Sequence, residues 1–406
     1  MVSELNSILA KYENLLGKKS VSRIKKKADE LQQYSILNVN STKFGGGVAE
    51  ILNSMLPLMK ELGLDVDWRT FTAPDKFFEI SKKMHNALQG NMDIHFTDEE
   101  IAMYKKQASD TYKQIDPNED FVIIHDPQPC PVIGELNKKE NKWIWRCHID
   151  TSEPNPQAWN LISKYLPMYD ALIFTKMEFA RKGIHDNIYQ ITPSINPFSP
   201  KNKMLDHEEA RKIVEKFIPL NKPLITQVSR FDPWKDPLGV IDVYRKVNEE
   251  IPIHLALIGS LAHDDPEGAE WLEKIENYSK GDENIHVLSN LDGIGDLEVN
   301  AFQSISDVIL QKSIREGFGL TVTEALWKET PVIGGNVGGI QLQIEDGVNG
   351  FLVNSIDEAA DRVLYLLKHP ERAKEMGKNG REKVKNNFLL FSHVEKYLDL
   401  FRDLIK

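Results

Sequence analysis

The sequence predicts an α/β fold with two Rossmann-like, doubly wound domains, because two series of short apolar strands alternate with longer helical patterns. Several strands are too continuously apolar to alternate, which is typical of strands buried on both faces of a parallel sheet. A chain of 406 residues is long enough for two such cores. Ligands bind these sheets at the carboxyl ends of the strands, so motifs there are interpreted first for function.

The first series of strands lies in the amino-terminal half of the chain. Helices are expected between these strands at 48–62 and at about 97–115. The expected strands are 34–40, 64–71, 121–126, 142–150 and 170–175.

The second series begins after 191–203, where Pro, Ser and Asn indicate a linker. A last helix at 391–405 is expected to pack back on the first domain. The expected strands are 223–229, 253–259, 284–289, 306–311, 330–335 and 350–354. The expected division is a first domain over 1–196, a linker region over 197–222, a second domain over 223–385 and a C-terminal helical segment over 386–406.

Composition and charge argue against several classes of protein. The formal net charge of -11 disfavours nucleic acid or an anionic membrane as the main partner. Cys130 and Cys147 form neither a disulfide framework nor a CxxC metal motif, which favours a reducing cytoplasm. The N-terminus lacks the apolar block of a signal peptide, and no apolar run is long enough to span a membrane. A cytoplasmic protein is therefore expected.

A glycine-rich turn follows the first strand, in "NVNSTKFGGGVAEIL". Gly45, Gly46 and Gly47 have no Cβ, so a ligand can approach the backbone closely. Their N–H groups at a helix start suit a phosphate or a sugar hydroxyl. The motif is not GxGxxG, and the next strand lacks the acidic end of the NAD fingerprint. The alternative interpretation is a tight turn between strand and helix.

Two cations follow the first strand of the second domain, in "VSRFDPWKDP". Arg230 offers a bidentate fork and Lys235 a point charge, which together suit a diphosphate. Asp236 and Pro237 are expected to be the N-cap and first residue of a helix. The alternative is two solvated loop cations.

Two glutamates flank a glycine-rich stretch in "REGFGLTVTE". Glu316 lies in the loop, and Glu324 about one turn into the following helix. A carboxylate can accept two hydrogen bonds from vicinal hydroxyls, which suits a ribose or a hexose. The alternative for Glu324 is a solvent-facing helix residue.

The stretch "WRCHID" places His148 and Asp150 at the carboxyl end of an apolar strand, where a structural histidine is the alternative to a functional one. Further glycine turns occur in "VIGGNVGGI" and "DGVNGFLV", where ordinary turn chemistry is the alternative.

Together these motifs resemble the retaining glycosyltransferases of family four, which have the GT-B fold of two Rossmann-like domains separated by a cleft. The likeness rests on Arg-x4-Lys, on Glu-x7-Glu about eighty residues later, and on "VGGI" and "DGVNGFLV". It covers essentially the whole chain and is strongest to the trehalose glycosyltransferring synthases. It implies an acceptor-side first domain and a nucleotide-sugar-binding second domain. It also implies transfer of glucose from ADP-, UDP- or GDP-glucose to free glucose, reversibly giving α,α-trehalose and nucleoside diphosphate.

The resemblance also implies roles for individual residues. Arg230 and Lys235 would hold the donor diphosphate, Glu324 the ribose hydroxyls and Glu316 the hydroxyls of the transferred glucose. The amides of Gly317, Phe318, Gly319 and Leu320 would lie near Glu316. From the first domain, Gly46 and Gly47 would approach the donor, His148 would contact the donor sugar near its reacting carbon, and Asp150 would contact the acceptor. Many relatives have Gly where this chain has Asp236, a difference expected to change the helix cap.

Several alternatives remain open at this point. A trehalose phosphorylase would use inorganic phosphate with a similar diphosphate clamp, and a retaining transferase could take another sugar acceptor. A sugar-nucleotide epimerase on the same fold would use no separate acceptor, whereas a non-catalytic sugar-binding protein usually carries an export signal. No DxD-type pair ends a strand, so the cations are expected to replace a metal, with a divalent ion such as Mg²⁺ as an aid. The oligomeric state stays open, with a homodimer as one candidate.

Overall fold

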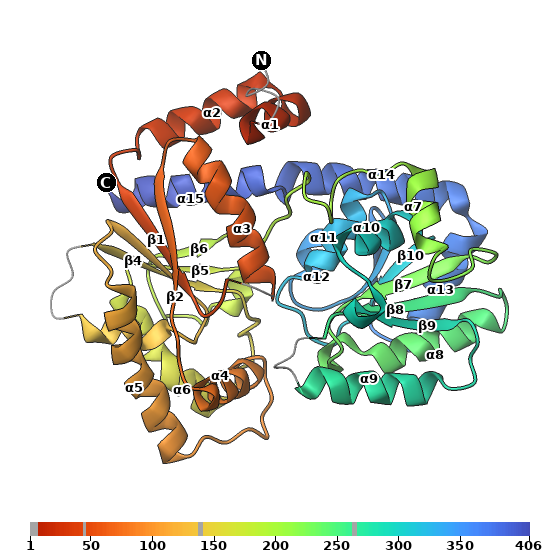
Figure 1. The fold of residues 1–406 in the computed structure, drawn as a ribbon, viewed down its shortest axis with the longest axis horizontal. Helices are drawn as coiled ribbons and strands as arrows, with labels where there is room; N and C mark the ends of the chain where they lie inside the picture. The colour runs from red at the N-terminus through yellow and green to blue at the C-terminus, as the bar shows by residue number, and fades with distance from the viewer. Residues whose placement is uncertain (1–6, 44–45, 137–140, 262–265) are drawn as a thin grey trace. The chain divides into compact units, whose positions relative to one another are not determined.

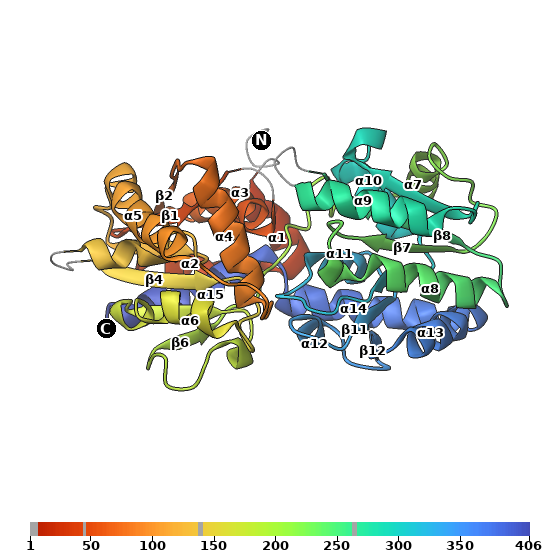
Figure 2. The same cartoon turned by 90° about the horizontal axis from the view of Figure 1, so that it is seen from below.

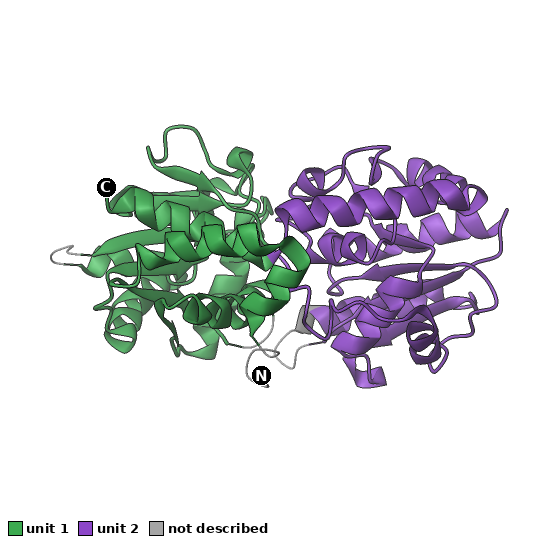
Figure 3. Ribbon diagram, turned by 90° about the horizontal axis from the view of Figure 1, so that it is seen from above, with its two compact units in different colours: residues 1–193, 390–406 green, residues 194–389 purple. Residues whose placement is uncertain are grey.

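The computed structural model describes residues 7–43, 46–136, 141–261 and 266–406. The chain divides into two compact units, coloured separately in Figure 3. Unit 1 consists of Met1–Pro193 and Leu390–Lys406, and unit 2 of Ser194–Leu389. Each unit contains one six-stranded sheet whose neighbouring strands run parallel, so the predicted class of fold is confirmed.

The sheet of unit 1 has the strand order β2-β1-β3-β4-β5-β6. Its register pairs Leu37 with Val122 and Val122 with Trp143, which brings large apolar side chains onto one face. The strands are β1 (Ser35–Asn40), β2 (Asp65–Thr70), β3 (Phe121–His125), β4 (Lys142–Cys147), β5 (Ala171–Phe174) and β6 (Ile188–Gln190).

Helices cover both faces of this sheet. The face that carries Val122 and Trp143 packs against apolar side chains of α4, α5 and α6. On the other face, α15 lies beside α2 and α3 (Figure 1), and the Phe401 ring packs 4.7 Å from that of Phe121 in β3. The helices of unit 1 are α1 (Ile8–Leu16), α2 (Lys18–Asp29), α3 (Gly46–Glu61), α4 (Asp75–Leu88), α5 (Asp98–Ile115), α6 (Pro156–Ser163) and α15 (Leu390–Leu404).

The sheet of unit 2 has the order β12-β11-β10-β7-β8-β9. Helix α8 lies beside α13, and α10 beside α7 (Figure 2). The strands are β7 (Leu224–Val228), β8 (His254–Gly259), β9 (Ile285–Ser289), β10 (Val308–Gln311), β11 (Val332–Gly335) and β12 (Gly350–Val353). The helices are α7 (His207–Val214), α8 (Pro237–Asn248), α9 (Pro266–Ser279), α10 (Asp296–Ile305), α11 (Leu320–Trp327), α12 (Ile340–Gln343), α13 (Ile356–Lys368) and α14 (Pro370–Asn387).

The structure departs from the sequence interpretation at three places. Strand β4 ends at Cys147, so His148 and Asp150 lie in the loop beyond it. The edge strand β6 was not expected, because its three residues, two half-exposed and one exposed, are too few to show an apolar pattern. The region interpreted as a linker contains α7, which packs Ala210, Ile213 and Val214 into the core of unit 2.

The entry into α8 confirms the expected helix start at Asp236 and Pro237. Asp236 is the N-cap, its side chain accepts a hydrogen bond from the Gly239 amide, and Pro237 is the first helical residue. The carboxylate also pairs with Lys312, which follows β10. Asp236 has a φ of 49°, a left-handed conformation that glycine adopts most readily. The same backbone therefore accommodates either residue, and aspartate adds a cap and an ion pair.

Because Asp236→Ala and Asp236→Gly lose the same carboxylate, their difference isolates the backbone conformation. We expect the glycine variant to be more stable by about 1 kcal/mol in the free energy of unfolding, measured with urea. At Asp357, in the first turn of α13, the order should reverse because alanine is the better helix former. Alanine equal to or better than glycine at position 236 would contradict a left-handed backbone there.

Candidate functional site

The candidate site in unit 2 lies where the strand order reverses. The chain runs outward through β7, β8 and β9, then returns to place β10 on the other side of β7. The loops that leave β7 and β10 diverge at this point, which is where open parallel sheets bind ligands. Arg230 and Lys235 are in the first loop and Glu316 is in the second. The two motifs were predicted separately, and the sheet brings them together.

Lys235 and Glu316 form a close ion pair across these loops. Their Nζ and Oε2 atoms are 2.6 Å apart, and the side chains are 14% and 10% exposed. Ser313 donates a second hydrogen bond to the same oxygen, and the Gln227 side chain donates to the Lys235 carbonyl. This network holds Lys235 in place before any ligand is present, so its charge is preorganised.

Arg230 occupies a different environment from Lys235. Its guanidinium lies 3.1 Å from Asp232 Oδ2, and its side chain is 58% exposed. An exposed ion pair of this kind contributes little to stability. Arg230 is therefore able to reorient toward an anion at the strand end at small energetic cost.

The loop after Glu316 is shaped by glycines. Gly319 precedes α11 with a φ of 82°, and α11 has no side-chain cap at its N-terminus. A Cβ on Gly339, in the loop after β11, would collide with the Gly317 carbonyl and with Phe318. The Gly339 amide instead donates to the Glu316 carbonyl at 3.0 Å. The two glycine loops thus support each other, while Gly317 to Leu320 form the entry to α11.

Phe318 and Glu324 are buried more deeply than the sequence interpretation implied. Phe318 packs against Phe388, with ring centroids 5.6 Å apart, so its side chain is structural and only its backbone lines the loop. Glu324 is fully buried, and its carboxylate lies 2.9 Å from Lys201 Nζ and 3.0 Å from Gln303 Nε2. The alternative of a solvent-facing glutamate is wrong. A ribose contact at Glu324 requires the carboxylate to become exposed.

The charge of Glu324 is maintained by its neighbours. Burial raises the pKa of this carboxyl, but the ammonium groups of Lys201 and Lys328 and the Gln303 hydrogen bond outweigh burial and lower the pKa overall. The Lys328 ammonium itself donates to Gln303 and to Asn202. A carboxylate in this network is therefore ionised at neutral pH and anchors residues 201–202 to α11.

The equivalent reversal in unit 1 falls between β1 and β3, and polar side chains gather there as well. His125 Nε2 lies 3.1 Å from Asn38 Oδ1, and His125 Nδ1 lies 3.2 Å from His148 Nε2. Asn38 and His125 are buried, whereas His148 is half-buried. The His148 amide donates to Asp126 at 2.8 Å, which fixes the loop after β4. His148 is thus the most accessible member of a buried polar chain.

The remaining predicted residues of unit 1 are placed as follows. Gly46 begins α3 with a φ of 74° and has no atom near its missing Cβ, and Gly47 follows it in the first turn. Gly45 lies outside the described residues. Asp150 is buried, and its Oδ1 accepts hydrogen bonds from the Ser152 amide and hydroxyl. Asp150 therefore stabilises its own loop.

Sequence reasoning missed several residues in or near the candidate sites of the two units. Lys312 pairs with Asp236, and Lys201 pairs with Glu324. Asn38, His125 and Arg146 are buried in unit 1, and the Arg146 guanidinium has no hydrogen-bond partner among the described residues. For Asn38, His125 and Arg146 the only signal was a polar residue within an otherwise apolar strand, whereas Lys312 and Lys201 lie outside the strands and carried no such signal.

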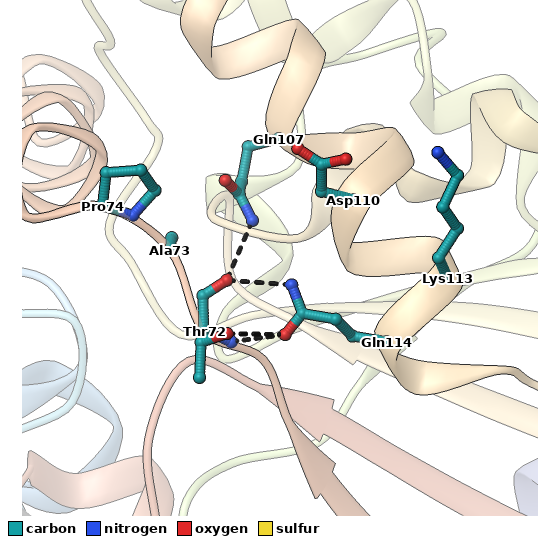
Figure 4. Close-up of a pocket in the computed structure, with 7 residues that line it drawn as sticks. All are labelled: Thr72, Ala73, Pro74, Gln107, Asp110, Lys113 and Gln114. Atoms are coloured by element: carbon teal, nitrogen blue, oxygen red, sulfur yellow. Dashed lines mark hydrogen bonds between the residues drawn. The ribbon is translucent and has the colours of Figure 1, made fainter.

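A shallow pocket lies elsewhere in unit 1, beyond the end of the edge strand β2 (Figure 4). Two of its polar side chains are already committed, since Gln107 and Gln114 both donate to the Thr72 carbonyl. Nothing in this pocket singles out a ligand. Among the described residues no group of three His, Cys, Asp or Glu side chains is arranged to hold a metal ion. No helix within the described ranges is long and apolar enough to cross a membrane.

Comparison with known proteins defines the class to which these two sheets belong. Residues 208–383 match the family model for glycosyl transferases group 1. The structure superposes on the UDP-forming α,α-trehalose-phosphate synthase of Burkholderia xenovorans with a TM-score of 0.73, at 15% identity, over 92% of this chain and all of the other. The chain is a glycosyltransferase with the GT-B fold.

More similar sequences identify the family. Residues 38–181 match the family model for the trehalose synthase N-terminal domain. The trehalose synthase of Thermococcus litoralis is 48% identical over 97% of this chain and 96% of its own length. The chain therefore belongs to the trehalose synthase family. A trehalose phosphorylase of Pleurotus pulmonarius is 27% identical over 87% of this chain but only 54% of its own length.

Replacement of Glu324 by Gln removes the charge that balances Lys201 and Lys328. We expect the free energy of unfolding to fall by about 3 kcal/mol at neutral pH, because a partly buried cation loses its partner. Glu329→Gln breaks the more exposed Arg381 pair and should cost less than about 1 kcal/mol.

The effect of Glu324→Gln should depend on pH. Because folding lowers the pKa of Glu324, its carboxylate adds stability at pH values above the ordinary pKa of 4.5. This stability is lost as the pH falls through the lower pKa of the folded state. The difference between wild type and variant should therefore narrow in acid. Urea titrations at several pH values measure it, and a constant difference would rule out a stabilising charge.

Proposed function

We propose that the protein is a retaining glucosyltransferase that joins glucose from a nucleotide-glucose to free glucose, giving α,α-trehalose and nucleoside diphosphate. The observation that carries the proposal is the Lys235–Glu316 pair at the strand-order reversal, beside the glycine loops that enter α11. A cation and a carboxylate at one strand end can bind the diphosphate and the sugar hydroxyls of one donor. The membership of the trehalose synthase family supports trehalose as the product.

Each predicted site residue has its own role in this proposal. Arg230 and Lys235 bind the diphosphate, and the amides of Gly317 to Leu320 add backbone donors at the N-terminus of α11. Glu316 accepts hydroxyls of the transferred glucose, and Glu324 those of the ribose once its carboxylate is exposed. Gly46 and Gly47 let the donor approach the backbone at the start of α3, and Asp150 contacts the acceptor.

The chemical step breaks the bond between the anomeric carbon and the diphosphate oxygen. Negative charge develops on the leaving diphosphate, where the preorganised Lys235 and the adjustable Arg230 stabilise it. His148 contacts the sugar near the reacting carbon. The anomeric hydroxyl of free glucose attacks from the face that the diphosphate leaves, and its proton passes to the departing phosphate oxygen. The two cations take the place of a required metal, and a divalent ion such as Mg²⁺ acts only as an aid.

Lys235→Ala or Arg230→Ala should lower kcat/KM for transfer by about 10²–10³, the scale of losing one preorganised charge contact. Lys246→Ala provides a matched control, because Lys246 lies in α8 of the same unit and forms an exposed ion pair with Asp357. Steady-state kinetics on folded variants measure the effect. Near-normal turnover in both site variants would remove the clamp from the mechanism.

The identity and configuration of the product test the reaction itself. With UDP-, ADP- or GDP-glucose and free glucose, in the absence of phosphate, we expect a non-reducing disaccharide with one symmetric α-anomeric environment in the proton NMR spectrum. A chelator should slow the reaction at most. A β-linked or reducing disaccharide would overturn the proposal, and strict dependence on phosphate would favour a trehalose phosphorylase.

A further inference from the structure

A chain of hydrogen-bonded side chains runs from the interior of unit 1 to the edge of its sheet. It begins at Asn38 in β1, continues through His125 in β3 and ends at His148 after β4. The two imidazole rings are nearly parallel, at 18°, with centroids 5.5 Å apart. Only His148, at the carboxyl end, is more than marginally exposed.

The direction of this chain follows from what each atom can donate. Asn38 Oδ1 can only accept, so His125 Nε2 carries the proton between them. In a neutral ring His125 Nδ1 is then bare, and it accepts the hydrogen bond from His148 Nε2. His148 is consequently the tautomer with a proton on Nε2 and a bare Nδ1.

The surroundings keep both rings neutral. Arg146 is fully buried in the neighbouring strand, and its register partner in β3 is His125. The charged and titratable groups of α15 that influence this interior are His393, Lys396 and Tyr397, and Asp126 and Cys147 lie on the sheet side. Burial, and then the Arg146 charge, lower the pKa of His125 to about 3 and that of His148 well below its ordinary value.

His393 does not compete for the chain, because its Nδ1 bonds to the Thr192 carbonyl at 2.7 Å. The Asp126 side chain is also occupied, by the His148 amide. Neither group supplies a proton to the two paired rings in the described contacts. In the described contacts, Asn38 therefore fixes the direction of the hydrogen bonds that run from Asn38 through His125 to His148.

We propose that Asn38 and His125 are positioning residues that hold His148 as the Nε2-protonated tautomer, so that its Nδ1 accepts a hydrogen bond from a sugar hydroxyl. The role toward sugar rests on the proposed function, whereas the tautomer follows from the unit 1 geometry alone. A neutral acceptor at this position binds a hydroxyl without placing a second positive charge beside the reacting carbon, where positive charge develops.

Nitrogen-15 NMR of histidine-labelled full-length protein tests the tautomer directly, because bare and protonated imidazole nitrogens resonate far apart. The His148 signals are assigned by their loss in His148→Gln. We expect bare Nδ1 and protonated Nε2 at pH 7, with no change as the pH falls through the ordinary histidine value of 6.5, because burial holds the pKa of His148 well below it. The opposite tautomer, or an imidazolium at pH 7, would overturn the proposal in the wild-type protein.

Asn38→Asp tests the role of Asn38, because it replaces only the side-chain amide by a carboxylate. A carboxylate in place of the amide favours protonation of His125 on both nitrogens, so His125 Nδ1 then donates and the His148 tautomer inverts. Asn40→Asp is the matched control, since Asn40 lies two residues along the same strand and bonds to Trp68 Nε1, not to a histidine. We expect inverted His148 signals only in the first variant, and unchanged signals there would contradict the proposal.

Transfer kinetics separate this inference from the proposed function. In Asn38→Asp we expect kcat to fall about tenfold or more, the scale of one lost hydrogen bond, with little change in donor KM. An inverted tautomer with unchanged kcat would overturn the positioning role and leave the proposed transferase intact. Absence of transfer in wild type would overturn the proposed function, while the NMR result would still decide the tautomer.

Discussion

Parallel strands all end at the same edge of a sheet, and this constraint determines where polar chemistry lies in both units. At each reversal of strand order the two central loops diverge, which leaves room for a ligand between them. In unit 2 the shared edge of the sheet places Lys235 Nζ 2.6 Å from Glu316 Oε2, although 81 positions separate the two residues in the chain. In unit 1 the same constraint lines up a residue of β1, a residue of β3 and His148 in the loop after β4 in one hydrogen-bonded row.

The two edges are built with opposite electrostatic character. Unit 2 places cations and carboxylates in partly exposed loops, where Arg230 can move and Lys235 is held. Unit 1 places neutral rings and an amide in front of a buried guanidinium. Because a buried unpaired cation makes protonation of nearby histidines unfavourable, the row stays uncharged. The cations of unit 2 suit the proposed reaction, in which negative charge grows on a diphosphate.

Close packing behind the edge is as important as the residues on it. The glycine loops after β10 and β11 touch so closely that a side chain at Gly339 has no space. Glu324 and Lys328 join α11 to Asn202 and Lys201, so the start of unit 2 is tied to the helix that follows the Glu316 loop. Glu324 is buried in this network and supports the fold, whereas Glu316 pairs with Lys235.

The sequence by itself determined the class of fold, eleven strand positions within a few residues, the N-cap of α8 and the loops that carry Arg230, Lys235 and Glu316. These are local properties, because apolar periodicity and turn residues act over a few positions. Only the tertiary structure decided that Lys235 pairs with Glu316, that Glu324 and Phe318 are buried, and that Asn38 and His125 stand behind His148. Those outcomes depend on strand order and burial, which join residues distant in the chain and leave no local pattern to recognise. The edge strand β6 escaped prediction because three residues are too short to show a pattern, whereas α7 carries a local signal in its Asp206 N-cap and acidic first turn that the linker interpretation overlooked.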